Sequence, residues 1–224
     1  MYPLRSLVIA FLIAISSIFH CAYGAEASLL PKYGQLPKTD EQKAADQDFL
    51  AGIDKLYKGD WKKATKNLSN LGWQFMRQGN SSDAMRRFNQ AWLIDRSNGD
   101  ALWGMAIVIG SSGKIAESAL LFAEAEPFLS DDIDFAVDYA RTFSIAATQA
   151  NDPALLEKAF IRFSQLYAKA PQHTLNLQNW AITLFHTGNY AEAWKKIKLA
   201  ELTPRRSALD SAFIADLQAK MPRP

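Results

Sequence analysis

The side chains that could catalyse a reaction are few, and their spacing matches no common catalytic or metal-binding pattern. Beyond the apolar N-terminus the sequence contains two histidines, His173 and His186, which are too far apart for a usual ligand pair. It has no Gly-x-Ser-x-Gly turn, no His-Glu-x-x-His pair and no Gly-Lys-Ser loop for phosphate. Asp131, Asp132 and Asp134 lack the glycine and the distal glutamate of a calcium loop, so helix capping explains them better. We therefore expect a protein that is not an enzyme and that uses no metal or cofactor.

Two tryptophans suit binding rather than catalysis. Trp73 and Trp103 both lie in segments whose apolar residues have helical spacing. A tryptophan exposed in a groove is a frequent hot spot of protein interfaces. Either ring can instead pack against an adjacent helix, and the sequence leaves both interpretations open. We expect Trp92 and Trp194, which lie in second helices of helix pairs, to be packing residues.

One helix-pair pattern occurs more than once along the chain. Its first copy consists of Leu71, Gly72, Phe75, Gly79, Ala84, Phe88 and Ala91, and its last copy of Trp180, Ala181, Leu184, Gly188, Ala193, Ile197 and Ala200. Phe122 repeats Phe88 at a spacing of 34 residues, and Phe163 follows after a longer interval of 41. A single pair cannot bury its apolar face, so we predict an all-α fold, an α-solenoid of stacked antiparallel helix pairs. The residues expected to pack the repeats together are Gly72, Phe75, Ala84, Phe88, Ala91, Phe122, Ala125, Ala159, Phe163, Ala193 and Ala200.

The same pattern predicts the organisation of the chain. An extended N-terminal arm is expected over residues 25–40, and a single helical domain over 41–220, with Asp40 as the N-cap of its first helix. The repeats of this domain cover 65–98, 99–132, 133–171 and 172–204, and a capping helix covers 205–220. The longer third interval is assigned to extra residues near 130–135, which lengthen a helix by about two turns.

The N-terminus is typical of an export signal. Arg5 precedes an apolar run from Leu7 to Ile15, and small residues around Gly24 provide a cleavage point, so we assign residues 1–24 to a signal peptide. The apolar run is too short for a stable membrane span. Lipidation at Cys21 is disfavoured because bulky residues precede it. We expect an exported protein of the periplasm or cell envelope, and no integral membrane protein once the signal is removed.

Composition limits the class of partner. Hydrophobic residues make up 49% of the chain and charged residues 21%, which is typical of a packed globular protein. With 25 basic and 23 acidic residues the charges nearly balance, so no nucleic-acid partner is expected. The densest basic cluster contains Lys55, Lys58, Lys62, Lys63 and Lys66. A solvated helix face explains this cluster better than a contact with anionic lipid, although peripheral association with the envelope stays open.

The residues Gly72, Phe75, Ala84, Phe88 and Ala91 resemble the tetratricopeptide repeat (TPR), and the run from Ala84 to Asp95 looks like exported bacterial TPR proteins of undefined role. Arg96 departs from the pattern, which ends in proline, and Ala106 replaces a glycine. The resemblance implies a concave groove, lined by the first helix of each pair, that binds a peptide or protein. The groove residues it implies are Trp73, Met76, Arg77, Trp103, Ile107, Arg141, Gln178, Ile182, Phe185 and His186, with Ser144 and Thr148 beside them.

The function we expect is a protein–protein or peptide interaction through this groove, in an adaptor or assembly factor whose partner the sequence does not identify. One alternative is an envelope small-molecule binder or atypical enzyme with a pocket between repeats. A second alternative is a self-associating structural protein, in which the arm around Leu29, Leu30 and Tyr33 fills the groove.

Overall fold

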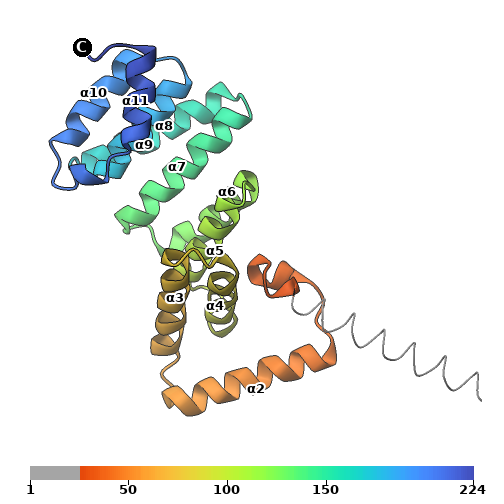
Figure 1. The fold of residues 1–224 in the computed structure, drawn as a ribbon. Coiled ribbons are helices and arrows are strands. Elements are labelled where there is room, and N and C mark those ends of the chain that lie inside the picture. Colours follow the sequence, from red (N-terminus) through yellow and green to blue (C-terminus); the bar gives the residue numbers. More distant parts are fainter. Residues whose placement is uncertain (1–25) are drawn as a thin grey trace, which may run out of the picture. The chain divides into compact units, whose positions relative to one another are not determined.

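The computed structural model describes residues 26–224, which form helices and no strand (Figure 1). The predicted signal peptide, its cleavage point at Gly24 and Cys21 lie outside the described residues. Within residues 26–224 no helix is long and apolar enough to cross a membrane.

Ten α-helices are present in the described part of the chain: α2 (Asp40–Tyr57), α3 (Trp61–Arg77), α4 (Ser81–Ile94), α5 (Gly99–Ser111), α6 (Ile115–Ala125), α7 (Ile133–Gln149), α8 (Pro153–Lys169), α9 (Thr174–His186), α10 (Tyr190–Glu201) and α11 (Ser211–Lys220). Short 3₁₀ turns occur at η1 (Pro31–Gln35), η2 (Glu126–Phe128) and η3 (Arg206–Ala208). The most extensive helix packing joins neighbours in sequence, namely α3 with α4, α7 with α8 and α9 with α10. The fold class is therefore the predicted all-α solenoid of helix pairs. The chain divides after Ile109 into two compact units.

Side-chain caps determine where several helices begin. Asp132 accepts the Phe135 N–H at 2.9 Å, so the acidic segment of the third repeat caps α7 as expected. The first long helix corrects our prediction, because its N-cap is Thr39 and not Asp40. Thr39 and Gln42 form a reciprocal capping box, in which each side chain accepts the other residue's backbone N–H. Asp40 instead lies in the first turn, where its charge is favourable toward the helix dipole.

Phe88 is the centre of packing in the N-terminal unit. Its ring on α4 is completely buried. A Cβ atom placed on Gly72 of α3 would lie 2.5 Å from this ring, and one on Gly104 of α5 would lie 2.2 Å from it. Only glycine therefore lets the backbones of α3 and α5 approach the ring so closely. This contact joins the first helix pair to the helix that follows it.

The C-terminal unit is packed around two groups of buried residues. In the first, Phe163 of α8 is completely buried and its ring stacks on Trp180 of α9 with centroids 6.2 Å apart. In the second, Trp194 of α10 is completely buried, and its indole N–H donates to the Met221 carbonyl at 3.0 Å beyond α11. The C-terminal helix thereby covers the apolar face that the last helix pair would otherwise expose.

The residues expected to pack the repeats are buried in both units, apart from Phe75. Phe75 is partly exposed at the end of α3, with the Arg87 guanidinium 6.0 Å from its ring centroid. Trp92 is buried as well, and the Arg96 guanidinium lies 3.9 Å from its ring centroid.

A buried amide on α4 binds the N-terminal arm. The side-chain nitrogen of Asn89 on α4 donates to the carbonyls of Ser28 and Leu30, each at 2.9 Å. Between these contacts and α2 the arm is not fully extended, because η1 contains positive φ values at Lys32 and Tyr33. The arm packs against α4, the second helix of its pair, whereas the predicted groove residues of this unit lie on the first helices α3 and α5.

The contact between Phe88 and Gly104 gives a first prediction. Gly104→Ala forces the ring and the α5 backbone apart and should lower the free energy of unfolding by about 1–3 kcal/mol. Gly52→Ala is the matched control, because it lies inside α2 and, apart from the adjacent backbone of its own helix, nothing is within 4 Å of the added methyl group. It should raise stability by about 0.5–1 kcal/mol through helix propensity. Urea unfolding followed by circular dichroism measures both, and equal effects would contradict this account of the core.

The Asn89 contacts give a second prediction. Asn89→Ala leaves the Ser28 and Leu30 carbonyls without this donor, so the arm should detach at a cost of about 1 kcal/mol for each lost hydrogen bond. Backbone amides of residues 29–36 should then exchange with deuterium faster, while those of α8 keep their protection. Asn70→Ala removes an exposed amide on α3 and should leave the arm unchanged. Unaltered exchange in Asn89→Ala would show that other contacts hold the arm.

Candidate functional site

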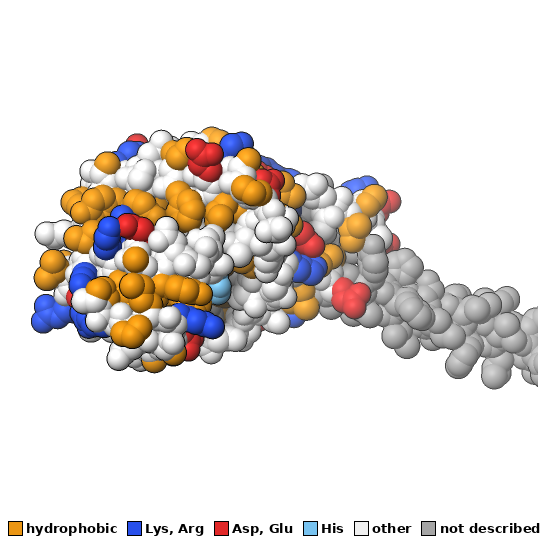
Figure 2. Space-filling model, turned by 90° about the horizontal axis from the view of Figure 1, so that it is seen from above, with side chains coloured by type: hydrophobic (Ala, Val, Ile, Leu, Met, Phe, Trp, Pro, Cys, Tyr) orange, Lys and Arg blue, Asp and Glu red, His pale blue; other side chains and the backbone are white. Residues whose placement is uncertain are grey.

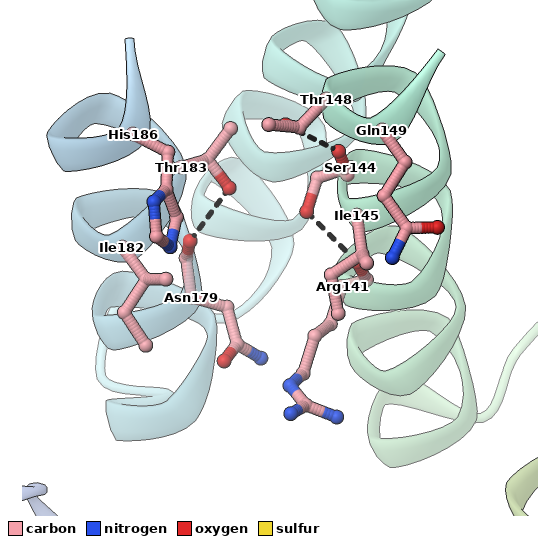
Figure 3. Close-up of a pocket in the computed structure, with 9 residues that line it drawn as sticks. All are labelled: Arg141, Ser144, Ile145, Thr148, Gln149, Asn179, Ile182, Thr183 and His186. Carbon is pink, nitrogen blue, oxygen red and sulfur yellow. Dashed lines mark hydrogen bonds between the residues drawn. The ribbon is translucent and has the colours of Figure 1, made fainter. Parts of the chain in front are cut away.

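A hollow of about 360 Å³ lies between α7 and α9 in the C-terminal unit (Figure 3). These are the first helices of two successive pairs. The lining residues are Arg141, Ser144, Ile145, Thr148 and Gln149 from α7, and Asn179, Ile182, Thr183 and His186 from α9. On each helix they recur at three- and four-residue intervals, so each set occupies one helical face.

The hydroxyl groups of the hollow hydrogen-bond to their own helices. Ser144 donates to the Arg141 carbonyl at 2.8 Å, and Thr148 donates to the Ser144 carbonyl at 2.8 Å. Thr183 donates to the Asn179 carbonyl at 2.9 Å. These protons are therefore not offered to a ligand, and no lining hydroxyl is activated by a neighbouring base.

The side chains that remain for recognition are a guanidinium, two amides and an imidazole. The side chains of Arg141 and Asn179 point into the space between the helices from opposite sides (Figure 3). Within residues 26–224 the Arg141 guanidinium has no ion pair, and none of the lining residues is acidic. Ile145 and Ile182 add apolar surface on the two walls. The hollow can therefore bind an anionic group together with apolar and amide surface.

The predicted residues of the N-terminal unit lie on α3 and α5. The rings of Trp73 and Trp103 meet edge to face with centroids 4.9 Å apart, and Trp73 also contacts Phe88 at 5.2 Å. Both indoles are partly exposed, so each ring packs against its neighbours while part of its surface stays accessible to a ligand. Met76 and Ile107 are also partly exposed, and Arg77 is exposed at the end of α3.

Two predicted groove residues contact the C-terminal segment instead of lining the hollow. Gln178 is 8% exposed, and its side-chain oxygen accepts the Asp210 N–H at 2.6 Å. Phe185 packs against Phe213 of α11, with ring centroids 5.7 Å apart. Both side chains therefore help to fix the start of α11.

Sequence reasoning did not select four of the residues that line the hollow, namely Ile145, Gln149, Asn179 and Thr183. Helical spacing could have identified two of them, because Ile145 is four residues from Arg141 and Asn179 is three residues from Ile182. Among the described residues no group of three or more His, Cys, Asp and Glu could hold a metal ion.

The contact between Gln178 and Asp210 gives a third prediction. Gln178→Ala leaves the Asp210 N–H without its acceptor and should lower the free energy of unfolding by about 1–2 kcal/mol. Gln149→Ala is the matched control, since this amide is exposed at the hollow and should change stability little. Thermal unfolding of both variants measures the difference. If Gln149→Ala were the more destabilising, the assignment of Gln178 to a packing role would fail.

Antiparallel helix pairs that repeat along the chain around buried aromatic residues such as Phe88, Phe122 and Phe163 define an all-α repeat protein. Known structures identify the repeat, since the chain has the fold of tetratricopeptide-repeat proteins. The thermophilic TPR protein TTC0263 from Thermus thermophilus superposes with a TM-score of 0.61 and 18% identity, covering 71% of this chain and 84% of that one.

Two further structures agree with this fold. PilF from Pseudomonas aeruginosa superposes with a TM-score of 0.57 and 18% identity, covering 71% of this chain and 70% of that one. YrrB, a TPR protein with an unusual peptide-binding site, superposes with a TM-score of 0.53 and 16% identity, covering 80% of this chain and 86% of that one. No family sequence model matches the chain, and no curated protein has a significantly similar sequence.

Proposed function

We propose that this protein is an exported scaffold that binds an extended segment of a partner protein in the hollow between α7 and α9. The TPR fold supports an interaction scaffold in general terms. YrrB, one of the structures similar to this chain, has a peptide-binding site. The position of the hollow between two first helices supports the same use of this surface.

The observation that carries the proposal is the Arg141 guanidinium, which has no ion pair within the described residues and faces the Asn179 amide across an apolar-walled hollow. An extended peptide offers backbone N–H and C=O groups that an amide side chain can pair. A carboxylate on that peptide would form a charge-assisted hydrogen bond with Arg141. Ile145 and Ile182 would bury an aliphatic side chain of the peptide between them. The ligand we propose is therefore a peptide segment with an acidic residue close to an apolar one.

The role we propose is that of an adaptor or assembly factor of the periplasm or cell envelope. The apolar N-terminal run behind Arg5 supports export, and the near balance of charge supports a protein partner over nucleic acid. On the face in Figure 2, basic and acidic side chains are interspersed with hydrophobic ones. Nothing in the lining of the hollow supports catalysis, because no lining hydroxyl is paired with a base.

Site-specific photocrosslinking in cells tests this proposal. A photoreactive amino acid at position 182 should capture one dominant heterologous protein. The same amino acid at position 161, which is 48% exposed on α8, should not capture it. Arg141→Glu should lower the capture by about tenfold or more, because it replaces a charge-assisted contact with a repulsion. Arg205→Glu makes the same change of charge at an exposed position outside the hollow and should leave the capture intact.

The other outcomes distinguish the alternatives. Equal capture at positions 182 and 161, or equal loss with both arginine variants, would contradict the hollow as the site. Capture of a second copy of this chain alone would indicate self-association. The volume of the hollow also lies in the range of small-molecule sites. Saturable heat of binding with a purified metabolite, lost in Arg141→Glu, would favour that second function.

A further inference from the structure

The corner between α2 and α3, which we call the α2–α3 corner, comprises residues 55–66. It carries five exposed lysines in twelve positions: Lys55, Lys58, Lys62, Lys63 and Lys66. None of the five has an ion pair within the described part of the chain, whereas Lys38, Lys43, Lys114 and Lys195 each face a carboxylate. Asp60 is the only acidic residue within the corner, and its carboxylate caps α3 by accepting the Lys63 N–H at 2.9 Å. The corner is therefore strongly cationic although the whole chain is nearly neutral.

Two large apolar side chains are exposed in the same segment, and Trp61 is on the face of α3 that continues into the buried Ala64 and Leu68. Leu56 is 71% exposed near the end of α2, and Trp61 is 39% exposed at the first position of α3. Water solvates lysines well, whereas the exposed apolar area of Leu56 is better accommodated in an apolar phase. Tryptophan is enriched where an apolar phase meets water, because its ring is apolar and its N–H is polar.

The positions of two lysines are also unfavourable for the helix itself. Lys62 and Lys63 occupy the first turn of α3, where the partial positive charge of the helix N-terminus disfavours cations. No acidic residue accompanies them in that turn. The Asp60 carboxylate at the N-cap is favourable at the same helix end, but it balances only one of the nearby positive charges.

We propose that the α2–α3 corner docks on the surface of an anionic phospholipid bilayer. The five ammonium groups lie among the lipid phosphates, and Leu56 and Trp61 enter the interfacial layer beneath them. Charge complementarity selects an anionic surface, and the exposed leucine and tryptophan select a lipid surface over a soluble polyanion. The docking residues belong to the N-terminal unit and are separate from the α7–α9 hollow, so the proposal does not depend on the peptide site.

Co-sedimentation of the purified protein with lipid vesicles tests the proposal. Binding should occur with vesicles of phosphatidylglycerol and phosphatidylcholine, weaken with added salt, and be absent with phosphatidylcholine alone. The triple variant K62Q/K63Q/K66Q should bind about 100-fold more weakly. The control K158Q/K169Q/K220Q removes the same charge at exposed positions outside the corner and should bind as well as the parent protein. Circular dichroism of both variants verifies that they remain folded.

A second variant separates a membrane from a soluble polyanion. Leu56→Ser removes apolar surface without changing charge, so it should weaken vesicle binding several-fold and leave the affinity for soluble polyphosphate unchanged. The proposal is overturned if the protein does not bind the anionic vesicles, or if both triple variants lose binding equally. It is also overturned if Leu56→Ser binds vesicles as the parent does, because the contact would then be electrostatic attraction alone.

Discussion

The packing of the N-terminal unit depends on one aromatic ring that occupies space left by two missing side chains. Gly72 and Gly104 belong to different helices, yet both backbones approach Phe88 so closely that a single methyl group on either would collide with the ring. This contact joins two successive helix pairs, because α4, the second helix of one pair, provides the ring, and α5, the first helix of the next, provides the space for it. In the C-terminal unit Phe163 is also completely buried, but the next first helix meets it with the stacked ring of Trp180 and not with a gap.

The helix pairs could be predicted from the sequence because the residues that pack them recur at fixed local intervals. Phe88 and Phe122 are both completely buried, as a stripe at helical spacing requires. The start of α2 was harder to predict, because Thr39 and Asp40 are both good capping residues. The reciprocal bonds with Gln42 decide between them, and they are visible only once the backbone is known. The placement of the arm on α4 could not be predicted, since it involves contacts distant in sequence, such as those of Asn89.

The candidate site was predictable to the level of the helical face and no further. Arg141, Ile182 and His186 reach the hollow because α7 and α9 present one face each. Gln178 and Phe185 occupy the same helix as Ile182 but turn toward the segment that begins α11. Where the last helix packs is a tertiary property, and the periodicity of α9 alone carries no information about it. The exposure of Leu56 and Trp61 is likewise a tertiary property, because it depends on whether another element packs over them.

The contacts of Asn89 also bear on the order in which the molecule forms. This side chain binds the carbonyls of Ser28 and Leu30 at sequence separations of 61 and 59 residues. Contacts at such separation form late, because the loop that they close must first be ordered. Because synthesis begins at the N-terminus, residues 26–36 therefore stay accessible until α4 has been synthesised. Any factor that acts on this segment, whether a protease or a chaperone, has that interval in which to reach it.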